Sequence, residues 1–100
     1  MYGTVARIRL ISGKEAELSG LLREYDQSKV PGAISEYLYR MDGDPNEYYL
    51  VVVFAGKAQY TANADSPEQD ARYQKLRALL ETDPEWHDGE IVHFLAWPDQ

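Results

Sequence analysis

The hydrophobic positions in the first quarter of the chain change from a strand period to a helix period. Between Val5 and Ile11 alternate side chains are apolar, which predicts a β-strand with one more apolar face. An apolar stripe with helical spacing follows at Leu18, Leu21, Leu22 and Tyr25. The segment Ser12-Gly13-Lys14-Glu15 before it fits a capping box, in which the Ser and Glu side chains satisfy free amide groups where a helix begins.

Two further strands are predicted in the middle of the chain. Ile34–Tyr39 and Tyr48–Phe54 are rich in β-branched and aromatic residues, and the segment from 42 to 46 between them has the residues of a turn, which indicates a hairpin. The run Leu50–Phe54 is apolar at odd and even positions alike, and such a strand needs cover on both faces. One layer of helices covers one face only. The other face is therefore expected to meet something else.

The last third of the chain predicts a second helix and a final strand. Residues 56–64 are expected to form a short helical turn, and Ser66-Pro67-Glu68-Gln69 has the residues typical of a helix start. Asp83-Pro84 ends this helix, because proline disfavours helical geometry in the residue before it. Asp88-Gly89 is predicted to be a turn, and Ile91–Trp97 the last strand.

The predicted order of elements is β-α-β-β-α-β. Two interleaved β-α-β halves with right-handed crossovers give a four-stranded antiparallel sheet with both helices on one face. We therefore predict the α+β class with ferredoxin-like architecture, in a single domain over residues 1–100. The helix-free face is expected to meet a second copy of the chain. Aspartate at Val52 and at Val53 should then disturb the helix face in one case and the dimer in the other.

Composition narrows the classes of function. Asp and Glu number 17 against 10 Lys and Arg, and the resulting formal charge of -7 disfavours nucleic acid and anionic membrane surfaces as partners. The absence of cysteine excludes disulfides, thiolate metal sites and cysteine nucleophiles. No apolar stretch approaches the roughly 20 residues of a membrane span, and the first residues lack the pattern of a signal peptide. We expect an acidic cytoplasmic protein.

Over nearly its whole length the sequence resembles the antibiotic biosynthesis monooxygenase family of dimeric α/β barrels. The resemblance rests on the element order and on three segments: Val30-Pro31-Gly32-Ala33, Leu50–Phe54 and Tyr60–Asp70. The stretch Asp83–Glu90 resembles a subgroup of small members of the family. It implies a homodimer whose two sheets close into a barrel, with a ligand cavity between sheet and helices in each subunit. Some relatives oxidise polycyclic phenols with O2 and neither metal nor flavin, others degrade haem, and others have no known activity.

Haem degradation is disfavoured, because the Asn, Trp and His residues that the haem-degrading relatives use are missing. The first strand contains no Asn, and the segment from Gly56 to Leu80 contains neither Trp nor His. The Asn, Trp, Tyr and Arg set of the phenol-oxidising relatives is not matched position by position either, since the Trp residues of this chain are Trp86 and Trp97. We expect no cofactor and no bound metal.

Four residues are the candidates for the chemistry that the resemblance implies. Oxygenation without a cofactor needs an apolar cavity, a base and donors that stabilise the substrate anion. Tyr73, Asn63 and His93 are the candidate donors, and Arg77 is a charge partner if it turns inward. Structural roles compete with these. Tyr73 lies on the core stripe of its helix, Asn63 suits a helix-end turn, and His93 suits a semi-buried core or interface position.

Other polar groups are given structural interpretations. Residues 85–88 contain three potential metal ligands, but a turn rarely presents three consecutive groups to one ion, so a turn anchored by a packed Trp86 is favoured. Arg7 and Arg9 lie on the strand face assigned to the partner, where a solvated or ion-paired role, for example with Glu36, is favoured over anion binding. Aromatic cross-strand pairs are predicted around the hairpin at Tyr37, Tyr39, Tyr48 and Tyr49.

Two classes of function remain open. The first is a cofactor-independent monooxygenase that acts on, or binds, a small aromatic or polyketide-like molecule. The second is a non-catalytic dimeric module that binds a hydrophobic ligand or a partner protein. An open cavity that holds His or Tyr beside a donor would favour the enzyme, whereas a cavity filled by its own side chains would favour the module.

Overall fold

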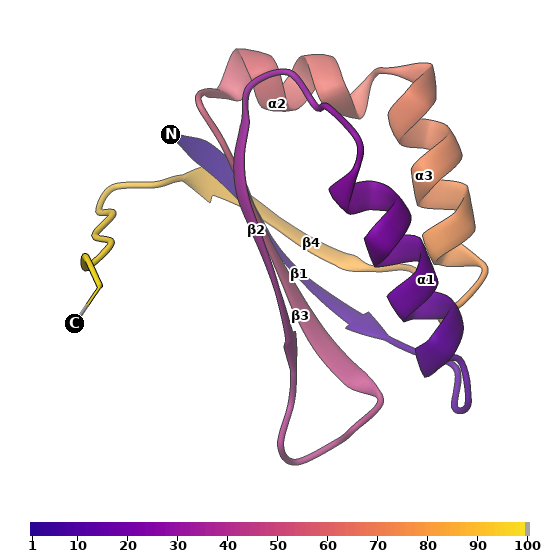
Figure 1. Ribbon diagram of the computed structural model, residues 1–100. Coiled ribbons are helices and arrows are strands. Elements are labelled where there is room, and N and C mark those ends of the chain that lie inside the picture. Colours follow the sequence, from indigo (N-terminus) through magenta and orange to yellow (C-terminus); the bar gives the residue numbers. More distant parts are fainter. Residues whose placement is uncertain (100) are drawn as a thin grey trace.

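A four-stranded antiparallel sheet carries the helices on one of its faces (Figure 1). The computed structural model describes residues 1–99. Its elements are β1 (Tyr2–Arg9), α1 (Glu15–Asp26), β2 (Ala33–Arg40), β3 (Glu47–Phe54), α2 (Lys57–Ala64), α3 (Pro67–Arg77) and β4 (Glu85–Glu90). The strand order β2-β3-β1-β4 is that of a ferredoxin-like fold, which confirms the predicted fold class. The helical turn expected at 56–64 is α2.

The register of the strands decides which side chains face the helices. Thr4, Ala6 and Ile8 of β1 are buried under the helices, whereas the odd-numbered residues between them point to the helix-free face. Thr4 pairs with Val52 of β3. Val52 therefore belongs to the helix side and Val53 to the opposite side, as a strand that is apolar at both parities requires.

The hydrophobic core lies where β1 and β3 meet α1 and the residues after α3. Its buried members are Ile8, Leu10, Leu18, Tyr48 and Leu80. Leu10 lies beyond β1, which begins and ends earlier than the predicted Val5–Ile11, and forms an isolated bridge with Leu80. This bridge attaches the segment after α3 to the sheet. None of the helices within residues 1–99 has the length and hydrophobicity that crossing a membrane requires.

The two predicted helix starts differ. At α3, the Ser66 hydroxyl accepts a hydrogen bond from the Gln69 amide at 3.1 Å, which confirms the predicted cap. At α1, the capping box predicted from Ser12 does not form, and Lys14 occupies the cap position without a side-chain bond. The reason is a turn at Gly13, whose φ of 91° places Ser12 outside the helix start.

Ser66→Ala is expected to lower the free energy of unfolding by about 1 kcal/mol, because the substitution leaves a helix amide without its acceptor. Ser12→Ala is the matched control and should change it by less than about 0.5 kcal/mol, since this serine caps nothing. Urea unfolding followed by circular dichroism measures both. Equal losses in the two variants would contradict the assignment of the caps.

The prediction of the last strand was wrong. The final strand is Glu85–Glu90, where Asp88-Gly89 was expected to turn, and the predicted strand Ile91–Trp97 lies outside the sheet. The neighbouring strand explains the difference, because β4 pairs with β1 and Tyr2 faces Glu90. The Ile91 amide then donates to the Met1 carbonyl at 2.9 Å, and the pairs between β1 and β4 run from Tyr2 and Glu90 to Arg7 and Glu85. The following segment extends away from the body of the molecule (Figure 1).

Candidate functional site

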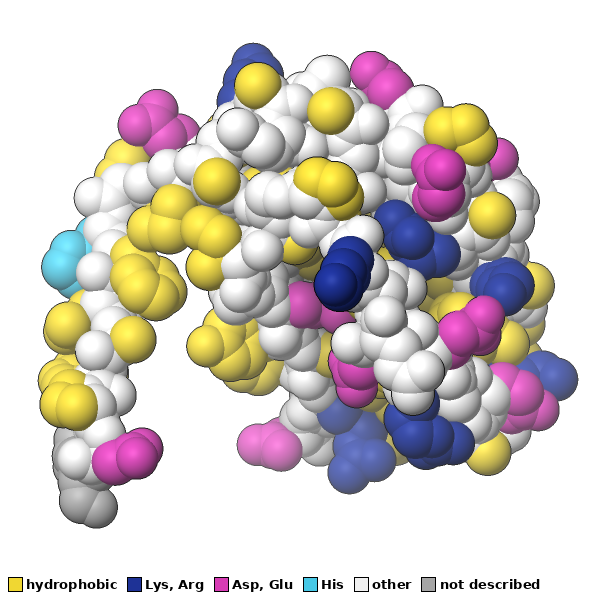
Figure 2. Space-filling view, turned by 45° about the horizontal axis from the view of Figure 1, so that its top comes forward, with side chains coloured by type: hydrophobic (Ala, Val, Ile, Leu, Met, Phe, Trp, Pro, Cys, Tyr) yellow, Lys and Arg dark blue, Asp and Glu magenta, His cyan; other side chains and the backbone are white. Residues whose placement is uncertain are grey.

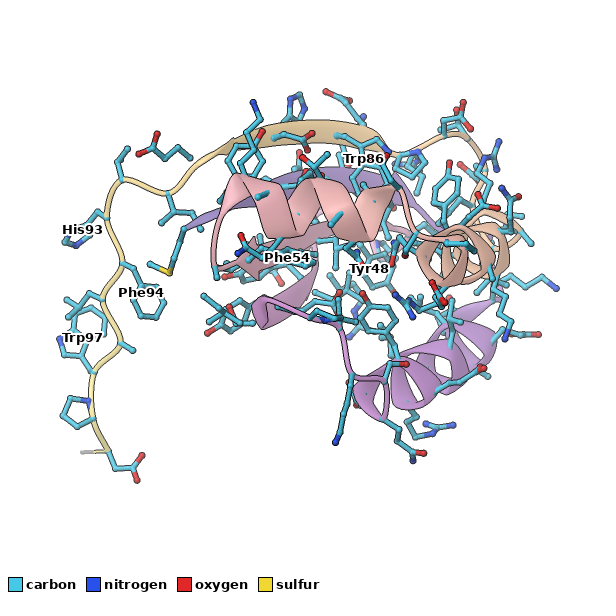
Figure 3. All side chains as sticks on the ribbon, turned by 90° about the horizontal axis from the view of Figure 1, so that it is seen from above. Tyr48, Phe54, Trp86, His93, Phe94 and Trp97 are labelled. Carbon is cyan, nitrogen blue, oxygen red and sulfur yellow. The ribbon has the colours of Figure 1, made fainter. Side chains whose placement is uncertain are left out.

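An open cavity of about 430 Å³ lies between the sheet and the helices. Its floor is apolar and includes Leu50, Val52 and Phe54 of β3. Phe54 is 1% exposed and lies beneath α2, where its ring meets Tyr60 edge to face with centroids 5.6 Å apart (Figure 3). A volume of this size falls in the range of small-molecule sites. The side chains of the chain itself therefore do not fill the space.

The helix wall of the cavity is polar and is organised around Arg72. Its Nη2 donates to Asn63 Oδ1 at 3.4 Å, and its Nε donates to Gln69 Oε1 at 3.2 Å. The guanidinium lies 5.1 Å from the centre of the Tyr25 ring of α1. These contacts from three helices hold a positive charge at the cavity. Such a charge favours an anion or a developing oxyanion in the bound molecule.

Tyr73 and Asn63, two of the four predicted site residues, lie at the cavity. The Tyr73 ring is tilted against Trp86 of β4, with centroids 6.3 Å apart. Asn63 accepts the hydrogen bond from Arg72 through its carbonyl oxygen, so its amide NH2 group stays available as a donor. The cavity thus combines a phenol, an amide and a guanidinium on neighbouring turns of α2 and α3.

The structure does not bring Arg77 and His93 to this cavity. Arg77 Nε donates to Asp83 Oδ1 at 2.7 Å, and its Nη1 donates to the Leu80 carbonyl at 3.0 Å. This side chain therefore links the end of α3 to the residues that follow it. His93 lies in the segment after β4, far from Trp86 in the view from above (Figure 3). It is exposed, and the expectation of a semi-buried strand position was wrong because residues 91–97 form no strand.

Sequence reasoning missed Arg72, although the helix period contained a signal for it. Gln69, Arg72, Tyr73 and Leu76 are spaced three and four residues apart, which places them on one face of a helix. All four line the cavity. Gln69 and Leu76, which flank Arg72 at three and four residues, carry this signal. Arg77 lies four residues after Tyr73 but is directed away by its bonds to Asp83 and Leu80.

A second polar pair closes the cavity on the side of β4. The Tyr60 hydroxyl donates to Asp88 Oδ1 at 2.8 Å and so links α2 to the edge strand. Partial burial of the phenol, followed by the nearby Asp88 carboxylate, raises the pKa of Tyr60 to about 12. Tyr60 therefore stays protonated at neutral pH, and its hydroxyl proton is used in the hydrogen bond to Asp88.

Residues 85–88 lie within strand β4 and do not form the predicted turn anchored by Trp86. Alternation along the strand sends Trp86 and Asp88 to the cavity, and His87 pairs with Glu85 at 2.9 Å. Trp86 packs on Tyr73 but remains 41% exposed. Within residues 1–99, no group of three His, Asp or Glu side chains is placed to share one metal ion.

The predicted ion pairs of Arg7 and Arg9 exist, but their partners differ from the expected Glu36. Arg7 Nη2 lies 2.8 Å from Glu47 Oε2, and Arg9 Nη1 lies 2.8 Å from Asp44 Oδ2. Glu36 faces Val52 in the register of β2 and β3 and lines the cavity. It therefore lies on the opposite face of the sheet from the two arginines.

Comparison with solved structures finds the same fold. SnoaB, a cofactor-independent oxygenase from Streptomyces nogalater solved as a point mutant, matches with a TM-score of 0.79 at 19% identity, over 94% of this chain and 95% of that one. A protein described as an antibiotic biosynthesis monooxygenase from Chloroflexus aurantiacus matches with a TM-score of 0.76 at 23% identity, over 95% and 96%. Another so described, from Nitrosomonas europaea, gives 0.77 at 14%, over 93% and 100%.

Sequence comparison agrees with the fold. No curated protein matches the chain. The family model described as antibiotic biosynthesis monooxygenase matches residues 1–75, a stretch that contains β1 to β3, α1, α2, most of α3 and three polar side chains of the cavity wall: Asn63, Arg72 and Tyr73. This chain belongs to the antibiotic biosynthesis monooxygenase family.

Proposed function

We propose that this protein is a cofactor-independent monooxygenase that oxidises a small hydroxylated aromatic or polyketide-like molecule in the cavity between sheet and helices. The observation that carries the proposal is the pairing of an open, apolar floor with the polar wall of Asn63, Arg72 and Tyr73. The apolar floor suits flat rings, and the polar wall suits the oxygen on which charge develops. Family membership supports the same class of reaction.

In the proposed reaction the substrate supplies the electrons and O2 is the oxidant. Loss of a proton gives a carbanion or phenolate, which passes an electron to O2 and then combines with the reduced oxygen to form a peroxide. When a CH2 carbon becomes a carbonyl, one oxygen atom enters the product and the other leaves as water. Arg72, the Asn63 amide and the Tyr73 hydroxyl would stabilise the anion, and the low polarity of the floor strengthens each of these interactions.

The test is oxygen uptake with anthrone-type substrates in buffer free of metal and flavin. Each of Tyr73→Phe and Asn63→Ala is expected to lower turnover about 10²–10³-fold, the loss typical of one donor to a developing anion. Asn46→Ala, in the turn between β2 and β3, is the matched control and should leave turnover unchanged. The folded state of each variant is checked by circular dichroism.

Two outcomes would overturn the proposal. Uptake no faster than the buffer blank, across several such substrates, would favour the non-catalytic module that binds a hydrophobic ligand or partner. Uptake that survives the combined replacement of Asn63, Arg72 and Tyr73 would place the reaction elsewhere in the molecule.

We also propose that two copies of the chain associate through the helix-free face of the sheet. Val5, Tyr37 and Tyr39 stay exposed on this face, with exposed fractions of 44%, 57% and 53%. The segment after β4 adds further apolar surface, which Figure 2 shows as a row of hydrophobic side chains apart from the body. Its exposed members are Val92, Phe94, Leu95 and Trp97. Exposed apolar side chains gathered in this way mark an interaction site.

A further inference from the structure

Two carboxylates at the cavity, Glu36 of β2 and Asp70 of α3, have no side-chain partner within the described part of the chain, and of these Glu36 is the one that stands on the sheet. Glu36 lies on the cavity side of β2, opposite Val52, and makes neither a hydrogen bond nor an ion pair with residues 1–99. The carboxylates on the other face differ, since Asp44 and Glu47 are held by Arg9 and Arg7. Glu36 is therefore free to accept a hydrogen bond from a bound molecule.

The titratable groups that interact with Glu36 lie at the end of α1, and α3 lines the same cavity. Tyr25 and Asp26 end α1, and Arg72 stands on α3 with its guanidinium engaged by Tyr25, Asn63 and Gln69. The cavity walls around the carboxyl, and then the negative charge of Asp26, raise the pKa of Glu36. Although it is reached by solvent at the mouth of the cavity, Glu36 is thus a stronger base than an ordinary surface glutamate.

We propose that Glu36 is the general base that takes the acidic proton of a hydroxylated polycyclic ligand, whose class follows from the proposed function. The proton moves from an O–H or C–H group of the ligand to a carboxylate oxygen of Glu36. The bonding electron pair stays on the ligand as a phenolate or enolate, so the total charge is unchanged. Arg72 and Asn63 across the cavity hold the resulting anion, and the exposed position of Glu36 lets the proton pass on to water.

The experiment compares Glu36→Gln with Glu68→Gln, which makes the same change at an exposed glutamate of α3. Turnover of a dihydroxyanthrone is followed by oxygen uptake, and binding of a dihydroxyanthraquinone, which O2 does not oxidise, by fluorescence. We expect Glu36→Gln to lower kcat/KM about 10²–10⁴-fold and to remove the acid limb of its pH profile. Binding should weaken about tenfold at neutral pH, because a charged acceptor is lost.

The pH dependence of kcat/KM and of ligand binding distinguishes a base from a residue that only supports the structure, because a structural role of Glu36 would not change this pH dependence. Asp26→Asn removes the negative charge that raises the pKa of Glu36, so the acid limb of kcat/KM should shift to lower pH. Binding of the anthraquinone to the wild type should strengthen as pH rises through the pKa of Glu36. In Glu36→Gln it should no longer depend on pH over this range.

The outcomes separate this inference from the proposed function. Wild-type protein that binds the anthraquinone through Glu36 but takes up no oxygen would overturn the monooxygenase and leave Glu36 as the acceptor for the ligand. Equal binding and equal turnover in Glu36→Gln and Glu68→Gln would overturn the role of Glu36. Failure of the wild type to bind the anthraquinone would overturn the class of ligand and the inference with it.

Discussion

Replacing Ile8 by alanine is expected to lower the free energy of unfolding by about 2–5 kcal/mol. Ile8 is 2% exposed and packs in the core with Leu10, Leu18 and Tyr48. Its strand is hydrogen-bonded on both sides, to β3 and to β4, so the backbone cannot move to fill the void that the shorter side chain leaves. Typical domains are stable by only about 5–15 kcal/mol in total, so the loss should be plain in urea unfolding.

Ile34→Ala is the matched control, because it removes the same atoms from a strand residue that is 51% exposed. Its effect should stay below about 1 kcal/mol. Both variants lose the strand propensity of an isoleucine. The difference between their losses in the free energy of unfolding therefore measures mainly the packing of Ile8 in the core. A loss at Ile34 as large as that at Ile8 would contradict the location of the core.

Val5→Asp is expected to convert the proposed homodimer into a folded monomer. Val5 lies on β1 between Val51 and His87, on the helix-free face, and its exposure means that aspartate fits the isolated subunit. In the dimer the same carboxylate would be buried without a partner at a cost of about 3–5 kcal/mol, which weakens association about 10²–10³-fold or more. Sedimentation equilibrium at micromolar concentration measures the change.

Ala58→Asp on the exposed surface of α2 is the control for added charge and should leave the dimer intact. The strand register also tells which of the two aspartate substitutions, at Val52 and at Val53, acts on which face of the sheet. Aspartate at Val52 enters the cavity floor and disturbs the helix side, whereas at Val53 it reaches the opposite face. A wild-type chain that sediments as a stable monomer would refute the dimer, as would a Val5→Asp variant that remains dimeric.

The elements that local chemistry specifies were predictable from the sequence. The α1 stripe, the hairpin and the Ser66 cap depend on residues within a few positions of one another, and all three are present. Ser12 shows the limit of such reasoning, because the residues of a capping box surround it and yet it does not cap α1. The positive φ at Gly13 moved the helix start beyond its reach.

The final strand was decided by its neighbour and not by its own residues. Ile91–Trp97 has the stronger strand pattern, whereas Glu85–Glu90 is polar and contains glycine. A strand forms only where another strand supplies hydrogen bonds, and β1 supplies them opposite residues 85–90. Propensity within a segment therefore could not locate β4.

The order of elements, the apolar character of β3 at odd and even positions and the stretch that contains Asn63 and Tyr73 could be predicted before any packing was known. Packing between distant segments was needed to show that a cavity stays open there and that Arg72 reaches it while Arg77 pairs with Asp83. It also placed Glu36 at the cavity, away from the arginines of β1. The physical reason is geometric, because the rotation of a helix about its axis and the register between strands depend on packing between distant segments.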